Sequence, residues 1–362
     1  MKKIKVGIFS FAHPHISALM RLLEQRPDVF EVVGFAEVSP YSEEKLEKHC
    51  AKMAEKFPDA KRFDDWIELA DAGLDFAVVT SDNASRREVC CALLSRGIHV
   101  IDEKPMAPLF EDAAAMVTCA KKNGVRMLTN WPIAWFPSFN LANQLLSEGR
   151  IGKLMRCVYR SPATWGPFSY SKDGQLPPDE ELLATWWYQA HRGGGSILDY
   201  ACYGAALSTW MFGHAADRVA CLTKQFATGF SDVEDYSAML LDFGEGVGLL
   251  EGSWSTYNPA EIPSGPVLYG TDGVIVCDRH SNVLKLYSGR SHTWVAPTEV
   301  IELPKPDVPM LSAESVVGCL VEGKEPHPLL CEELNLNVVA ALDAGARSAK
   351  TGVTEAVRRL TP

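Results

Sequence analysis

The sequence has little of what marks nucleic-acid-binding and membrane proteins. Its 35 Lys and Arg are outnumbered by 46 Asp and Glu, the formal net charge is −11, and the basic residues form no run longer than a few. A chain this acidic is a poor ligand for a phosphate backbone or an anionic membrane surface. No apolar stretch approaches the ~20 residues of a membrane span. We therefore expect neither nucleic acid nor a membrane as a partner.

Cysteine spacing and secretion signals are also missing. None of the ten cysteines forms a Cys-x-x-Cys pair, which argues against a zinc site or a disulfide framework. Most lie among apolar residues, as buried reduced thiols do. The apolar run Val6 to Phe11 is too short for a signal sequence, and no small-residue cleavage site follows it. We expect no metal and a cytoplasmic location.

The first 130 residues alternate two patterns. Short apolar runs are separated by helical patterns that Gly97 and Gly124 help to close. Strands that are apolar throughout are typical of a parallel sheet covered by helices on both faces. This predicts a doubly wound Rossmann domain over residues 1–128. Its strands are expected at 5–10, 30–36, 74–80, 98–102 and 125–129, and its helices at 16–24, 42–57, 86–96 and 111–123.

The pattern changes after about residue 150. Strand-like runs follow one another with only turn residues between several of them, which indicates an antiparallel sheet. We predict an α+β domain with a large, mostly antiparallel open sheet over 129–362, for substrate binding and oligomerisation. Strands are expected at 155–160, 218–226, 236–243, 247–253, 274–278 and 283–287, and helices at 139–148, 198–211 and 333–348. The last helix is a candidate to pack back on the first domain.

A doubly wound sheet binds its ligand near the helix after the first strand, where G-x-G-x-x-G usually stands. Here that stretch reads Ser10-Phe11-Ala12-His13-Pro14-His15, without the glycines. Ala12 is still small enough for a pyrophosphate to approach, and Pro14 suits the first turn of a helix, whose N–H groups bind phosphate. We expect cofactor contacts from Ser10, Phe11, Ala12, His13 and His15.

The second strand ends in Glu37, about 20 residues beyond the phosphate turn. A carboxylate there accepts hydrogen bonds from ribose hydroxyls and repels a 2′-phosphate. Glu37 therefore favours NAD over NADP. The alternative is that Glu37 is one exposed acid among 46.

The strand at 98–102 runs into Glu103-Lys104-Pro105. A lysine at the carboxyl end of a parallel strand points at the ligand crevice, where it can hydrogen-bond a substrate hydroxyl and carry its proton. Pro105 sets the backbone turn. The alternative is an ordinary surface lysine.

Four segments together resemble the Gfo/Idh/MocA family of oxidoreductases, named for glucose–fructose oxidoreductase and inositol dehydrogenase, over nearly the whole chain. Residues 97–105 resemble its G-x-H-V-x-x-E-K-P segment, which is its most specific motif. Residues 81–83 stand at its cofactor-lining Thr-Pro-Asn. Residues 148–153 resemble its turn into the second domain, and 193–203 resemble its G-G-G-x-x-x-D-x-G-x-H segment.

The resemblance implies a nicotinamide-dependent oxidoreductase whose catalytic Lys and Asp are Lys104 and Asp199. It also implies further cofactor contacts from Thr80, Ser81, Asn83, Glu103 and Lys104. The family's frequent His is Tyr203 here, as in members similar to glucose–fructose oxidoreductase, where the tyrosine is an acid/base group. Asp199 and Tyr203 are four residues apart and share a helix face, and a nearby Lys104 would lower the pKa of Tyr203. The alternative for Tyr203 is a core tyrosine.

Five of the nine tryptophans fall between Trp131 and Trp187. Flat aromatic rings beside polar groups suit the C–H faces of a sugar or cyclitol. The alternative is that these rings fill a domain or dimer interface. We expect substrate contacts from Trp131, Trp165, Trp187, His191 and Arg192.

We therefore expect hydride transfer between the nicotinamide and a carbinol or carbonyl carbon of a sugar, cyclitol or related polyol. Two alternatives keep the fold: a glycoside-processing enzyme that recycles NAD within each turnover, and a non-catalytic NAD-binding sensor. A third alternative has a different fold, in which His13-x-His15 is the metal pair of an amidohydrolase-type barrel. The antiparallel second half of the chain argues against this alternative. An open sheet commonly buries its free face against a second subunit, so we expect a homodimer or homotetramer.

Overall fold

The computed structural model describes residues 2–39, 43–161, 177–256, 262–289, 295–304 and 313–360. The chain divides into two compact units, Met1–Trp131 with Met310–Leu336 and Pro132–Pro309 with Asn337–Pro362. Helix α10 (Glu332–Thr351) begins in the first unit and ends in the second. The chain therefore passes between the units three times. The first passage lies next to the boundary predicted at residue 128.

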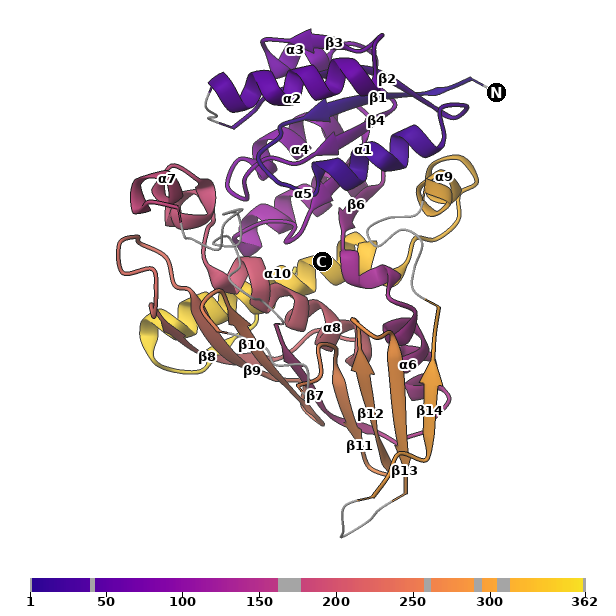
Figure 1. Ribbon diagram of the computed structural model, residues 1–362, viewed down its shortest axis with the longest axis vertical. Helices are drawn as coiled ribbons and strands as arrows, with labels where there is room; N and C mark the ends of the chain where they lie inside the picture. Colours follow the sequence, from indigo (N-terminus) through magenta and orange to yellow (C-terminus); the bar gives the residue numbers. More distant parts are fainter. Residues whose placement is uncertain are drawn as a thin grey trace. The chain divides into compact units, whose positions relative to one another are not determined.

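The first unit contains a six-stranded sheet in the order β3-β2-β1-β4-β5-β6, with every neighbouring pair parallel. This is the order of a dinucleotide-binding Rossmann sheet. The order in which successive strands are added to the sheet reverses between β1 and β4, although all strands run the same way. Figure 1 shows helices α1 to α5 packed around these strands. The strands are β1 (Ile4–Phe9), β2 (Phe30–Ala36), β3 (Lys61–Phe63), β4 (Phe76–Val79), β5 (His99–Glu103) and β6 (Met127–Asn130).

The helices of this unit follow local sequence signals. Helix α5 has Glu111 and Asp112 in its first turn and Lys121 and Lys122 in its last, which complements the helix dipole. It ends at Gly124, whose φ of 65° is left-handed. The helices are α1 (Ile16–Gln25), α2 (Glu43–Lys56), α3 (Trp66–Ala70), α4 (Arg86–Ser95), α5 (Phe110–Asn123) and α9 (Ala313–Val321).

The second unit contains a nine-stranded sheet in the order β14-β13-β12-β11-β7-β10-β9-β8-β15. Only β7 and β10 pair in parallel in the described part of this sheet. This confirms the predicted mostly antiparallel sheet. The strands are β7 (Leu154–Arg160), β8 (Arg218–Lys224), β9 (Tyr236–Asp242), β10 (Val247–Ser253), β11 (Val267–Gly270), β12 (Gly273–Asp278), β13 (Val283–Ser288), β14 (Glu299–Glu302) and β15 (Glu355–Ala356).

Helices cover one face of this sheet. Helix α6 (Pro137–Ser147) packs on β12 and β13, and α8 (Cys202–Phe212) packs on β7 and β10. The Ser348 hydroxyl of α10 accepts a hydrogen bond from the Cys221 amide of β8. Gly204 of α8 lies so close to Leu250 that an added Cβ would be 2.8 Å from its Cδ2, so a larger residue there would displace the Leu250 side chain. A short helix α7 (Asp179–Leu183) precedes α8.

The opposite face of the sheet carries exposed apolar side chains. Leu240, Leu249 and Val158 are adjacent across β9, β10 and β7, and the first two are 50% and 38% exposed. Leu222 is also exposed, at 58%.

Among the described helices, none is both long and apolar enough to cross a bilayer.

Candidate active site

The loop after β1 holds the geometry of a glycine turn without a glycine. Ser10 has a φ of 71°, in the left-handed region that glycine favours. Its carbonyl accepts a hydrogen bond from the Thr80 hydroxyl at 2.6 Å, and its amide donates to the Ala36 carbonyl at 2.7 Å. Ser10 and Thr80 are buried, and Ala12 is 5% exposed. The loop is thus fixed to the ends of β2 and β4, at the point where the strand order reverses.

Glu37 fastens the same loop from the end of β2. Its Oε1 accepts hydrogen bonds from the Ser10 hydroxyl and the amides of Val38 and Ser39, and its Oε2 accepts one from the Phe11 amide at 3.0 Å. Burial raises the pKa of the carboxyl group, and these hydrogen bonds oppose the rise. Because Oε1 accepts three described hydrogen bonds and Oε2 accepts one, Oε2 is the better acceptor for a ligand hydroxyl.

Residues 80–83 form the next part of this edge. Ser81 and Asn83 are buried. The Asp82 carboxylate accepts hydrogen bonds from the Ser85 amide and hydroxyl at 3.0 and 2.8 Å, and the Ser39 hydroxyl accepts one from the Asp82 amide. The structure thus brings the predicted cofactor residues of β1, β2 and β4 to one edge of the sheet.

Two histidines of the loop converge on Glu103 at the end of β5. The His15 Nδ1 lies 2.9 Å from the Glu103 Oε2, and the His13 Nδ1 lies 3.9 Å from the same oxygen. Glu103 is fully buried, and its Oε1 accepts a hydrogen bond from the Asn130 amide at 2.6 Å. Burial, together with the nearby Lys104 and Arg86 side chains, lowers the pKa of His13 well below its ordinary value.

Lys104 is 3% exposed at the carboxyl end of β5, so it is not an ordinary surface lysine. A fully buried arginine holds the backbone on both sides of it. The guanidinium of Arg86 donates to the carbonyls of Glu103, at 2.5 Å, and of Pro105, and to the Ser81 carbonyl at 3.0 Å. Arg86 therefore joins the Lys104 segment to the segment that begins at Ser81.

In the second unit, Asp199 lies in a π-helical turn, Ile197–Ala201, just before α8. Its Oδ2 accepts a hydrogen bond from the Trp254 indole at 3.0 Å. Tyr203, in the first turn of α8, has its ring 6.2 Å from that of Tyr200. Both Asp199 and Tyr203 are half-buried. Single π turns are frequent at functional sites because they redirect side chains that a regular helix would place elsewhere.

The residues expected to contact substrate lie in different environments. Trp187 is half-buried and stacks on Trp186 at 4.6 Å. His191 is exposed and Arg192 is half-buried. Trp131 is fully buried in the first unit, where its indole donates to the Asn335 amide oxygen at 2.6 Å. Its burial gives no support to the expected substrate contact of Trp131, which stays a prediction, and Trp165 lies outside the described residues.

Sequence reasoning missed three residues that shape these segments. Arg86 and Trp254 are described above. Glu234 is the third, and its Oε1 accepts a hydrogen bond from the Ile197 amide at 2.9 Å. Its carboxylate fills the space beside Gly195, whose φ is 104°. Burial raises the pKa of Glu234. The run of glycines before Asp199 was the one available signal that another group approaches this backbone closely.

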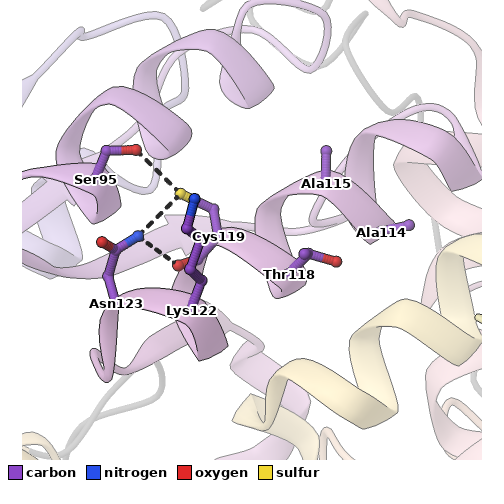
Figure 2. A pocket seen from close by; sticks show the side chains of 7 residues that line it. All are labelled: Ser95, Ala114, Ala115, Thr118, Cys119, Lys122 and Asn123. Atoms are coloured by element: carbon purple, nitrogen blue, oxygen red, sulfur yellow. Dashed lines mark hydrogen bonds between the residues drawn. The ribbon is translucent and has the colours of Figure 1, made fainter. Parts of the chain in front are cut away.

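An open hollow of about 660 Å³ lies elsewhere on the first unit, along α4 and α5 (Figure 2). The Cys119 thiol there contacts the Ser95 hydroxyl at 3.2 Å, and the Asn123 amide donates to the Cys119 carbonyl. In a parallel α/β unit the helices run opposite to the strands, so these late helix residues lie toward the amino ends of the strands. The hollow is therefore not part of the edge that holds Lys104.

Comparison with known families agrees with this geometry. Residues 5–130 match the model of the oxidoreductase family with an NAD-binding Rossmann fold, and residues 139–276 match the GFO/IDH/MocA C-terminal domain. The chain belongs to the GFO/IDH/MocA family. It is thus an oxidoreductase of a family whose first domain binds NAD, and the resemblance seen in the sequence is confirmed.

Similar proteins have dehydrogenase names. The mouse trans-1,2-dihydrobenzene-1,2-diol dehydrogenase is 26% identical over 77% of this chain and 79% of its own length. The scyllo-inositol 2-dehydrogenase (NADP(+)) IolU of Bacillus subtilis (strain 168) is 28% identical over 84% and 85%. The WlbA dehydrogenase from Bordetella pertussis, solved with NADH and UDP-GlcNAcA, is 20% identical over 99% of each chain with a TM-score of 0.77. That last likeness shows the fold alone.

Proposed function

We propose that the protein is an NAD-dependent dehydrogenase that moves a hydride between the nicotinamide and a carbinol or carbonyl carbon of a sugar, cyclitol or related polyol. One observation carries the proposal. A buried lysine, Lys104, stands at the carboxyl end of β5 in a sheet with the dinucleotide-binding strand order. Ligands of such sheets bind outside the carboxyl ends of the strands, so this lysine faces the ligand side.

The residues present fit a dinucleotide. Ser10 adopts the left-handed conformation of the missing first glycine, and Ala12 keeps the side chain at the second position small. The Glu37 Oε2 is available to a ribose hydroxyl, and a carboxylate there disfavours a 2′-phosphate. The guanidinium of Arg62, which lines the same small pocket as Glu37, is paired with Glu47 and Asp64. NAD is therefore favoured over NADP. When bound, the nicotinamide supplies the hydride acceptor or donor.

The chain's own groups supply the proton chemistry. In the first unit, the Lys104 ammonium hydrogen-bonds the substrate oxygen and stabilises negative charge on it as the hydride leaves or arrives. In the second unit, the Tyr203 hydroxyl is the acid/base group, and Asp199 binds a substrate hydroxyl. The Trp254 indole fixes the Asp199 carboxylate by a hydrogen bond, so this side chain is held before substrate arrives.

Two observations favour a hydroxylated ring as substrate. The second unit has a buried hydrophobic cluster of Leu182, Tyr188, Val233 and Trp254, with the partly buried rings of Trp187, Tyr200 and Phe230 packed against it. Partly exposed rings of this kind stack on C–H faces. In addition, the names of the mouse and Bacillus subtilis relatives both specify a hydroxylated six-membered carbon ring.

The test is turnover with a panel of inositols and aldoses, following NADH at pH 8. Lys104→Ala is expected to lower kcat about 10²- to 10⁴-fold, the range for loss of a positioned acid/base group. The control is Lys122→Ala, an exposed lysine of α5, which is expected to keep the wild-type rate. Equal rates for the two variants would refute the role of Lys104. Oxidised product without net NADH would instead favour recycling of NAD within each turnover.

We also propose that the open face of the second sheet forms a homodimer or homotetramer. The face is apolar along Leu240, Leu249 and Val158 and is bordered by the ion pair of Arg160 with Glu251. Two copies related by a two-fold axis would bring the same apolar face of each subunit together. Leu240→Lys is expected to give a monomer in light scattering, whereas Val353→Lys, at an exposed residue outside this row, is not. A monomeric wild-type mass would end the proposal.

A further inference from the structure

We propose that His13, His15 and Glu103 form a binding site for one divalent transition-metal ion, with Zn²⁺ as the favoured occupant. This goes beyond the proposed dehydrogenase function, which assigns no role to a metal. Within the part of the chain that the structure describes, this is the one group of His, Cys, Asp and Glu side chains whose potential ligand atoms converge within 4.8 Å of one another.

The distances suit a metal centre. Zinc lies about 2.0–2.1 Å from imidazole nitrogens and carboxylate oxygens, so two of its ligand atoms are roughly 3.3 Å apart in a tetrahedron and roughly 2.9 Å apart at a right angle. The two imidazole nitrogens lie 2.9 and 3.9 Å from the Glu103 Oε2, which brackets these values. All three ligand atoms lie within 4.8 Å of one another, and the His13 nitrogen would move closer to the Glu103 oxygen when an ion binds.

The protein prepares the ligands as metal sites generally do. A ligating carboxylate is usually oriented by an outer hydrogen bond, and Asn130 supplies one to the Glu103 Oε1 at 2.6 Å. The His13 Nδ1 accepts a long hydrogen bond from the His15 amide at 3.3 Å, and a bound metal ion would replace this hydrogen bond. Both histidines come from the loop after β1, where His15 stands at the position of the third glycine of G-x-G-x-x-G.

The surrounding charges and the ligand atoms together limit the kind of ion. Lys104 and Arg86 place two positive charges near His13, which oppose any divalent cation, so the site requires an ion that binds imidazole strongly. Imidazole ligands favour zinc, copper, iron and nickel, which form stronger bonds to nitrogen. Three protein ligands leave a fourth position of a tetrahedral ion for water or for an oxygen of a bound ligand, as in zinc sites that are not purely structural.

The test is stoichiometry and affinity for the metal alone, without cofactor. Tag-free, full-length protein is freed of metal with a chelator and titrated with Zn²⁺ against a competing indicator, and Co²⁺ is added to a second sample to record its visible absorption. We expect one equivalent of each ion and a tetrahedral Co²⁺ spectrum. Less than 0.2 equivalent of bound metal would overturn the proposal.

Variants locate the site. His15→Gln, at a partly exposed side chain, is expected to lower Zn²⁺ affinity at least 100-fold, and Asn130→Ala about 10- to 100-fold, the usual effect of losing an outer hydrogen bond. His280→Gln, at an exposed histidine of the second unit, is the control. Equal affinities for His15→Gln and His280→Gln would refute the assignment. Because NADH binding is measured separately, failure of the metal site and failure of the dehydrogenase function are distinguishable.

Discussion

We predict that Arg86 positions Lys104. Replacing Arg86 tests this prediction, because the expected loss in the free energy of unfolding follows from its hydrogen bonds. The three carbonyls that its guanidinium satisfies belong to Ser81, Glu103 and Pro105, all of which are buried. A buried acceptor left without a donor costs about 1–3 kcal/mol. Arg86→Met leaves three such acceptors, so the cost is about 3–9 kcal/mol. That is comparable to the stability of a whole domain, so this variant is not expected to fold.

Arg86→Lys is therefore the informative change. An ammonium keeps the charge but lacks the planar fork of a guanidinium, so at least one carbonyl loses its donor. We expect the free energy of unfolding to fall by about 1–3 kcal/mol. We also expect kcat to fall about 10- to 100-fold, because a displacement of roughly 1 Å in a reacting group costs about that much. Lys104 itself is unchanged in this variant.

The assay combines urea unfolding with steady-state kinetics well below the unfolding transition. Arg87→Lys is the matched control, since Arg87 is the neighbouring residue, is 53% exposed and pairs with Asp112 on the surface. Its unfolding free energy should change by less than about 0.5 kcal/mol. The reasoning is refuted if Arg86→Lys loses no more stability and no more kcat than Arg87→Lys. A loss of stability with kcat unchanged would show a purely structural role.

Three further predictions concern other parts of the chain. Burial lowers the pKa of His327 to about 4, so the unfolded chain takes up a proton at this residue first as the pH falls below about 6.5. The free energy of unfolding of the wild type should therefore drop by up to about 2 kcal/mol between pH 7 and pH 5, as measured by urea unfolding. His327→Asn, which keeps the acceptor for the Leu329 amide, should show a smaller drop. Glu37→Gln should weaken NADH binding and reduce the preference over NADPH, and an unchanged ratio of dissociation constants would contradict the assigned role. Gly194→Ala should cost about 1–3 kcal/mol or more in unfolding free energy, because the new Cβ would be 2.1 Å from a backbone carbonyl oxygen, whereas Gly229→Ala, with open space around it, should be close to neutral.

The sheet of the first unit was predictable because its strands are continuous apolar runs. Strand β2 begins and ends at the predicted residues, and β1 is shifted by a single residue. Strand β3 was missed because its Lys-Arg-Phe sequence lies at the sheet edge and is largely exposed, so it has no apolar signal. In the second unit β14 was missed for the same reason, since all but one of its residues are exposed and the other is half-buried.

The parts of the candidate site that lie at strand ends were predictable from the order of strands along the chain. Strand ends placed Ser10, Glu37 and Lys104 at one edge, since parallel strands end together. Side-chain direction was not predictable. Asp199 was expected on a regular helix, but a π turn and an α-helix share nearly the same apolar spacing, so the pattern could not tell them apart. The hydrogen bond of Trp131 to Asn335 was also not predictable, because the two residues are 204 positions apart in the sequence.

The direct test of the central claim is nucleotide binding, followed by quenching of tryptophan fluorescence as the wild-type protein is titrated with NADH and, in parallel, with NADPH. The fixed left-handed turn at Ser10 and the carboxylate of Glu37 predict saturable binding that is tighter for NADH. Absence of binding by either nucleotide would show that the loop without glycines does not hold a dinucleotide, and the dehydrogenase function would then be contradicted.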